Sequence, residues 1–126
     1  MYVTTVDQAR EYEVRRRGVK GVCVRYLLHA GVGAKRIQLR LFTIAPGGHT
    51  DMERHGHEHE VFVLEVKAVF KGEGSPMEVG SGYAVFIGSN EPHQIINEGS
   101  EPLQFLCTKE TAEVPSEILS KKRCSR

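Results

Sequence analysis

Apolar and polar residues alternate with a period near two along most of the chain, and the apolar positions are rich in Val, Ile, Phe and Tyr. This alternation is typical of β-strands, because successive side chains of a strand point to opposite faces. It predicts strands over residues 19–28, 37–44, 59–70, 77–79, 83–87, 93–97 and 103–109. Short stretches rich in Gly, Pro, Ser and Asn separate these segments and predict turns, among them Pro46-Gly47-Gly48.

The order of the predicted elements indicates an all-β sandwich or barrel. No amphipathic helix of about ten residues lies between the strands, as strand–helix–strand units would require. Residues 113–122 predict one short C-terminal helix, with Ser116 as its N-cap. The chain has 126 residues and a mass of 14.1 kDa, without a long repeat or linker. We therefore expect a single domain over residues 1–126, ending in a short basic tail.

Composition and charge narrow the class of protein. Seventeen Lys and Arg residues oppose sixteen Asp and Glu residues, a net charge of +1, so the chain lacks the basic excess typical of nucleic-acid binding. The first eighteen residues contain scattered charges and no apolar core, which predicts neither a secretory signal nor a membrane anchor. We expect a cytoplasmic protein without nucleic-acid or membrane partners.

The three cysteines are odd in number and form no close pair, which predicts reduced thiols rather than a disulfide framework. Cys23 and Cys107 lie in apolar runs and are expected to be small core residues. Cys124 lies in the polar tail.

Four of the six histidines fall between residues 49 and 59. On an extended backbone, Glu53 and His55, His57 and His59 would share one face, because they are spaced by two residues. Imidazole and carboxylate groups on one face suit a divalent ion such as Mn, Fe, Ni or Zn. A further histidine, His93, directly follows a predicted turn in another segment and could join them. No cysteine lies nearby, which argues against a closed structural zinc site.

Two motifs in these segments resemble those of the cupin superfamily. The family's second motif, G-x5-P-x-G-x2-H-x3-N, falls in correct spacing on Gly82, Gly88, Asn90, His93 and Asn97. Asn90 replaces a glycine, and asparagine tolerates the left-handed backbone conformation better than most residues. The first motif, G-x5-H-x-H-x3,4-E-x6-G, starts at Gly47, places its ligands on Glu53, His55 and His59, and ends at Val66.

The resemblance implies a small single-domain cupin, with a double-stranded β-helix or jelly-roll barrel over about residues 19–109. It implies that Glu53, His55, His59 and His93 hold the metal, which is the usual set of three histidines and one glutamate in a permuted order. A second register takes His55-Gly56-His57 as the histidine pair. It makes His57 an alternative ligand but leaves only Glu60, one residue too early, as the acidic ligand. The first register is preferred because it needs no inserted residues.

These features predict an open mononuclear site that binds one divalent transition metal. Iron or manganese is favoured, and nickel, zinc or copper is possible. The leading hypothesis is a dioxygenase-type oxidoreductase that acts on a small organic molecule, with Glu53 also available as a general base. A non-catalytic small-molecule-binding cupin and a metal-dependent isomerase or lyase are the alternatives. The resemblance also implies a homodimer, with the contact expected at Val22, Val24, Tyr26 and Leu28.

Overall fold

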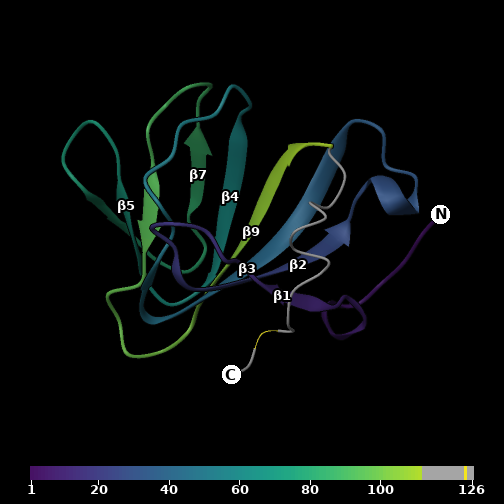
Figure 1. Cartoon of the computed structure of the whole chain (residues 1–126), viewed down its shortest axis with the longest axis horizontal. Coiled ribbons are helices and arrows are strands. Elements are labelled where there is room, and N and C mark those ends of the chain that lie inside the picture. The colour runs from purple at the N-terminus through teal and green to yellow at the C-terminus, as the bar shows by residue number, and fades with distance from the viewer. Residues whose placement is uncertain (112–123, 125–126) are drawn as a thin grey trace.

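The computed structural model describes residues 1–111 and Cys124, and most of this part of the chain forms curled β-structure (Figure 1). The strands are β1 (Glu11–Glu13), β2 (Lys20–Leu28), β3 (Ile37–His49), β4 (His59–Glu65), β5 (Ala68–Lys71), β6 (Met77–Val79), β7 (Ala84–Ile87), β8 (Gln94–Ile96) and β9 (Leu103–Glu110). Of two short 3-10 helices in the N-terminal third, η1 (Val6–Gln8) precedes β1 and η2 (Ala30–Val32) lies between β2 and β3. The all-β prediction is confirmed, while the helix predicted over 113–122 lies outside the described residues. None of the described helices has the length and apolar character needed to span a membrane.

Strand β3 is central to the sheet because it connects the strands β6, β5 and β8 to the strands β9, β4 and β7. One edge of β3 pairs with β2. The other edge pairs first with β9, from Ile37 to Ile44, and then with β8 at His49. The strand order is therefore β6-β5-β8-β3-β9-β4-β7, and the sheet curls around the bend in β3 (Figure 1).

The turn predicted at residues 46–48 is instead an irregular part of β3. Its pairing with β2 shifts register between Lys20 and Val22. Gly47 has a φ of 78°, and a Cβ on Gly48 would lie 2.5 Å from the carbonyl oxygen of Lys20. Glycine permits both features, since it tolerates positive φ and close backbone approach. The strand thereby continues to His49, next to the histidine cluster.

The inner face of the curled sheet carries the apolar core. Its most buried apolar side chains, each no more than 2% exposed, are Val22, Val24, Ile44, Val63, Ala68, Leu103 and Phe105. Phe42 stacks on Phe105 across the β3–β9 pair, with ring centroids 5.2 Å apart. Burying each of these side chains larger than alanine contributes about 1.5–3 kcal/mol to folding. Val22 and Val24, two of the four residues at which a dimer contact is expected, are among these core side chains, and the homodimer stays a prediction.

Asn97, the last residue of the second motif, joins β8 to β3. Its side chain is fully buried, and its amide nitrogen donates to the carbonyl oxygens of Ile44 (2.9 Å) and Glu101 (2.8 Å). Its amide oxygen accepts from the backbone nitrogen of Gly99 (2.9 Å). A buried amide satisfied in this way fixes the backbone around it.

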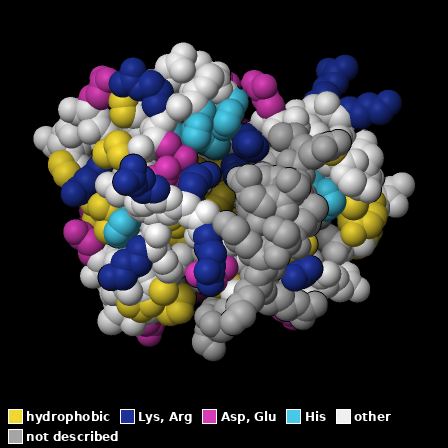
Figure 2. Space-filling model, viewed as in Figure 1, with side chains coloured by type: hydrophobic (Ala, Val, Ile, Leu, Met, Phe, Trp, Pro, Cys, Tyr) yellow, Lys and Arg dark blue, Asp and Glu magenta, His cyan; other side chains and the backbone are white. Residues whose placement is uncertain are grey.

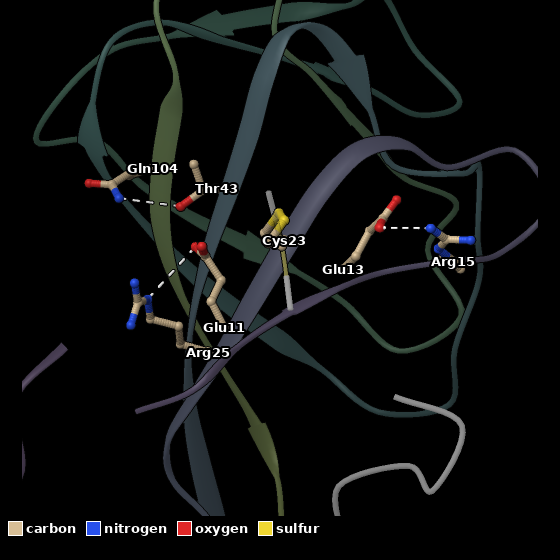
Figure 3. Close-up of a disulfide and its surroundings, with 8 residues drawn as sticks. Glu11, Glu13, Arg15, Cys23, Arg25, Thr43 and Gln104 are labelled. Carbon is tan, nitrogen blue, oxygen red and sulfur yellow. Dashed lines mark hydrogen bonds and ion pairs between the residues drawn. A yellow bond between two sulfur atoms is a disulfide. The ribbon is translucent and has the colours of Figure 1, made fainter. Parts of the chain in front are cut away.

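The structure corrects the cysteine prediction. Cys23 of β2 is joined by a disulfide to Cys124, 101 residues further along the chain (Figure 3). The side chain of Cys23 is buried, and its strand neighbour on β3 is Thr43. Cys107 is a free, buried thiol, as predicted. Spacing along the sequence could not reveal the pair, because the fold brings distant segments together.

The continuous strand predicted over residues 59–70 is also wrong, because it divides at Val66. β4 ends at Glu65, β5 begins at Ala68, and Val66 has a φ of 59°. A branched side chain is strained in this left-handed conformation, which glycine adopts freely. Val66 occupies the position where the first motif has glycine, so the turn persists without the residue that suits it.

Replacing Val66 with Gly should therefore relieve backbone strain while removing part of a half-buried side chain. We expect the free energy of unfolding of Val66→Gly to stay within about 1 kcal/mol of wild type in urea denaturation. The control is Val85→Gly, which also packs against the core but lies in the regular strand β7. It should lose about 2 kcal/mol or more. Equal losses for the two variants would contradict the strain at Val66.

Candidate metal centre

Three histidines from different segments converge at one end of the curled sheet. His55 lies in the loop between β3 and β4, His59 is the first residue of β4, and His93 immediately precedes β8. One ring nitrogen from each lies within 4.8 Å of those of the other two. His59 and His93 are each only 7% exposed.

A backbone bridge between Glu53 and His93 brings the loop after β3 next to the residues before β8. The nitrogen of Glu53 donates to the carbonyl oxygen of His93 (3.0 Å), and the nitrogen of His93 donates to the carbonyl oxygen of Glu53 (2.9 Å). Further hydrogen bonds link Thr50 to Ile95, so this bridge extends the contact between the end of β3 and β8. The two sequence motifs thus meet through their backbones.

The Glu53 carboxylate lies beside two of the imidazoles. Its Oε2 is 3.2 Å from His55 Nε2, and its Oε1 is 3.7 Å from His93 Nε2. Arg16, in the segment between β1 and β2, donates to Glu53 Oε2 (3.0 Å) and to Asp51 (2.9 Å). Burial raises the pKa of Glu53, but the neighbouring His93 and His55 and the Arg16 guanidinium outweigh it and lower the pKa to about 2. Glu53 is therefore an anion at neutral pH.

His59 is held neutral with one nitrogen free. Its Nδ1 lies 3.4 Å from the thiol sulfur of Cys107, and its Nε2 is buried without a hydrogen-bond partner in the described part of the chain. Burial, and then the Arg40 charge, lower the pKa of His59 to about 3. A neutral imidazole with an unpartnered nitrogen is the form that coordinates a metal ion. Burial also raises the pKa of the Cys107 thiol, although Arg40 lies beside it.

His93 is oriented by the backbone. Its Nδ1 lies 2.9 Å from the carbonyl oxygen of Glu91, to which it can donate, and its Nε2 then faces the cluster. Such a hydrogen bond fixes the tautomer and ring orientation of a metal ligand. Burial lowers the pKa of His93, but Glu53 and the Glu91 carbonyl outweigh it, so the pKa is raised. A metal bound at Nε2 would compete with the proton that Glu53 favours at His93.

The remaining candidate residues lie around this group. His57 stacks on His55 with ring centroids 4.6 Å apart, but it is not among the three converging histidines. Burial, and then the charge of Lys109, lower the pKa of His57. Glu60, the acidic residue of the second register, is exposed and lies 3.5 Å from the hydroxyl of Thr108. The structure therefore brings together the residues of the first register and leaves His57 at the margin.

The four groups fit a divalent transition metal. Three imidazoles and one carboxylate are donors that such ions accept, and the orphaned Nε2 of His59 has no other partner among the described residues. A second donor group combines Glu11 with Cys23 and Cys124. Because these two sulfurs form a disulfide rather than thiolates, that group does not offer comparable ligands.

The histidine cluster borders a cavity of about 160 Å³ inside the curled sheet. Figure 2 shows histidine side chains reaching the surface, with acidic and basic side chains beside them. Most of the cavity wall is apolar, from residues such as Val24, Phe42, Val61, Ile87 and Phe105. Its other polar groups belong to Arg16, Tyr26, Arg40, Thr50, Cys107 and Lys109.

Sequence reasoning missed the charged residues of this cavity. Arg16 belongs to a run of three arginines, a pattern that usually indicates a solvated face, and its contact with Glu53 joins segments 37 residues apart. Arg40 gave a usable signal, because it shares its strand parity with Phe42 and Ile44, which both face inward. A charged residue at an inward-facing position is unusual unless it has a function.

Comparison with known proteins agrees with this geometry. A profile of the Cupin domain matches residues 40–109. An uncharacterized protein of Methanocaldococcus jannaschii is 30% identical over 106 residues, which cover 82% of each chain. The 1-methylthio-D-xylulose 5-phosphate methylsulfurylase of Rhodospirillum rubrum is 37% identical over 90 residues, 66% of this chain. The matched part spans about half of that relative's length, 53%.

The solved structure of the polyketide cyclase RemF from Streptomyces resistomycificus superposes with a TM-score of 0.84 and 31% sequence identity. The match covers 91% of this chain and 82% of the cyclase. It supports a jelly-roll barrel as the form of the curled sheet. The profile match, the relative matched over 82% of both chains and this structural neighbour together show that the chain belongs to the cupin family.

Proposed function

We propose that this cupin binds one divalent transition-metal ion through Glu53, His55, His59 and His93, and uses it to act on a small organic molecule in the cavity. The observation that carries the proposal is the convergence of three imidazoles, those of His55, His59 and His93. One of them, His59, has a buried Nε2 that lacks a hydrogen-bond partner in the described structure. An apolar cavity with a few convergent polar groups is the usual form of a small-molecule site.

The donor set favours iron or manganese. Nitrogen donors combined with a single carboxylate suit these ions, and four protein ligands leave positions open in a six-coordinate shell. When bound, the ion would supply Lewis acidity and a place for a substrate oxygen or dioxygen. The leading candidate is accordingly a dioxygenase-type oxidoreductase.

Glu53 is better suited to hold the metal than to act as the general base. A carboxylate with a pKa of about 2 is a weak proton acceptor at neutral pH, whereas efficient general bases have pKa values closer to the working pH. Arg16 donates a hydrogen bond to Oε2 of the same carboxylate and helps to hold it in place. Within this proposal, Glu53 is therefore a ligand whose orientation Arg16 maintains.

The polyketide cyclase favours a second candidate. Its similarity covers most of both chains, and cyclisation needs no net oxidation, so a metal that only polarises a carbonyl would suffice. In this version His57, which stacks on His55 and lines the cavity, would move a proton at the substrate.

Metal content provides the direct test. We expect protein purified under metal-replete conditions without a thiol reductant, which keeps the Cys23–Cys124 disulfide, to hold about one transition-metal ion per chain by elemental analysis. His93→Ala should lose most of it, because one missing ligand weakens binding about tenfold to a hundredfold or more. The matched control is His49→Ala, which removes a half-buried histidine outside the converging group and should retain the metal. Equal metal content in wild type and His93→Ala would refute the proposed site.

Oxygen uptake separates the two candidates. The leading candidate predicts that iron-loaded protein consumes dioxygen when supplied with a catechol, enol or diketone, and that His59→Ala abolishes the uptake. Conversion of such a substrate without oxygen uptake, at equal rates in air and under nitrogen, would support the Lewis-acid candidate instead. Tight retention of an unmodified compound without turnover would contradict both and indicate a binding protein.

A further inference from the structure

Arg40 is a buried cation without a counterion in the described structure. Its side chain belongs to β3, and the residue is only 8% exposed. Within residues 1–111, no carboxylate oxygen lies within 4.0 Å of its guanidinium nitrogens, and its Nε has no hydrogen-bond partner. Its contacts are a hydrogen bond from Nη2 to the Cys107 sulfur (3.2 Å) and the ring of Phe42, whose centroid is 4.9 Å from Cζ. Buried charges are normally paired, so this one requires an explanation.

The guanidinium lies in the wall of the cavity. Across the sheet, Arg40 is directly opposite Tyr26 of β2 on one side and Cys107 of β9 on the other. All three residues line the cavity. Lys109, two residues beyond Cys107 on β9, lines it as well and has no ion pair within the described residues. Burial, and then the charge of Arg40, lower the pKa of this lysine, which agrees with two cations facing one space.

These cations lie close to the proposed metal ligands. The Cys107 sulfur accepts from Arg40 and lies 3.4 Å from His59 Nδ1, so one sulfur atom separates the guanidinium from that imidazole. A small molecule in the cavity can therefore reach the histidine cluster and Arg40 together. The cavity volume of about 160 Å³ is below the range for drug-sized ligands, which restricts the occupant to a compact molecule.

We propose that Arg40 and Lys109 form an anion subsite, so that the ligand of this cavity is a compact organic anion, either a carboxylate or a phosphate ester. Its anionic oxygens bind the guanidinium fork and the lysine ammonium, and its other end faces the histidines. The planar donors of arginine suit both oxyanions, and the low-dielectric surroundings strengthen the interaction. The orientation toward the histidines rests on the proposed metal function, whereas the anion subsite does not.

The test measures binding of simple anions to the full-length protein by calorimetry. The probes are glycolate, as a carboxylate, and inorganic phosphate, with ethylene glycol as an uncharged compound. We expect at least one anion to bind and ethylene glycol not to bind. Tighter binding of glycolate identifies a carboxylate ligand, and tighter binding of phosphate identifies a phosphate ester. Absence of binding by both anions would overturn the proposal.

Variants assign the binding to these residues. Arg40→Met should weaken anion binding about 30-fold or more, since it removes a charge-assisted, two-pronged interaction. Lys109→Gln should weaken it by a smaller factor. The control Arg54→Gln removes an exposed arginine that neighbours the metal ligands in sequence but pairs with Glu73, and it should bind like wild type. Unchanged affinity in both Arg40→Met and Lys109→Gln would overturn the proposal.

Thermal stability distinguishes an anion subsite from a structural arginine. Because Arg40 has no carboxylate partner among the described residues, Arg40→Met should melt at the same temperature as wild type or higher, and added anion should no longer raise it. A lower melting temperature, with the anion-induced rise retained, would identify a structural role and contradict the proposal. Repeating the titrations after chelation separates the two hypotheses. Anion binding that survives chelation supports the subsite independently of the metal. If the same protein also fails to bind a metal when one is added back, the metal centre is refuted while the subsite stands.

Discussion

The backbone bridge between Glu53 and His93 determines where chemistry can occur in this protein. It continues the contact between the end of β3 and β8, which runs through Asn97, His49 and Thr50. Because each partner of the bridge is also a site residue, pairing the backbones places a carboxylate beside an imidazole. His55 and His59 follow within six residues of Glu53 and complete the group. The metal centre proposed here thus depends on a regular feature of the barrel.

Charge is distributed unevenly around this bridge. The whole chain has a net charge of +1, yet the described cavity gathers Glu53 together with Arg16, Arg40 and Lys109. Arg16 and the neighbouring histidines stabilise the single anion, which explains the low pKa of Glu53. The other two cations have no carboxylate opposite them in the described structure. An ion held by the histidines would add further positive charge, and an anionic ligand would balance it.

Much of the fold could be predicted from the sequence, because alternating apolar residues define strands and motif spacing identifies the family. The expected donors lie close together in the structure, but part of the reasoning that grouped them was wrong. Residues 53–58 are a loop with a bend rather than a strand, so shared parity is not what brings Glu53 and His55 together. The backbone bridge between Glu53 and His93 positions this loop beside β8. In the sequence, only the spacing of the two motifs indicated that these segments belong to one site. Local rules also failed at Val66, where tertiary structure imposes a turn that valine does not favour.

Long-range contacts could not be predicted in this way. The disulfide between Cys23 and Cys124 and the ion pair between Arg16 and Glu53 join segments that are distant in sequence. Burial of Arg40 was open to prediction from strand parity, but the absence of a described counterion required the structure. The central claim, that the bridge assembles one metal centre, is tested most directly by anomalous diffraction from crystals of the zinc-loaded protein. The account predicts one strong peak about 2 Å from ring nitrogens of His55, His59 and His93. A strongest peak elsewhere, such as beside Glu11 and the cysteine pair, would contradict it.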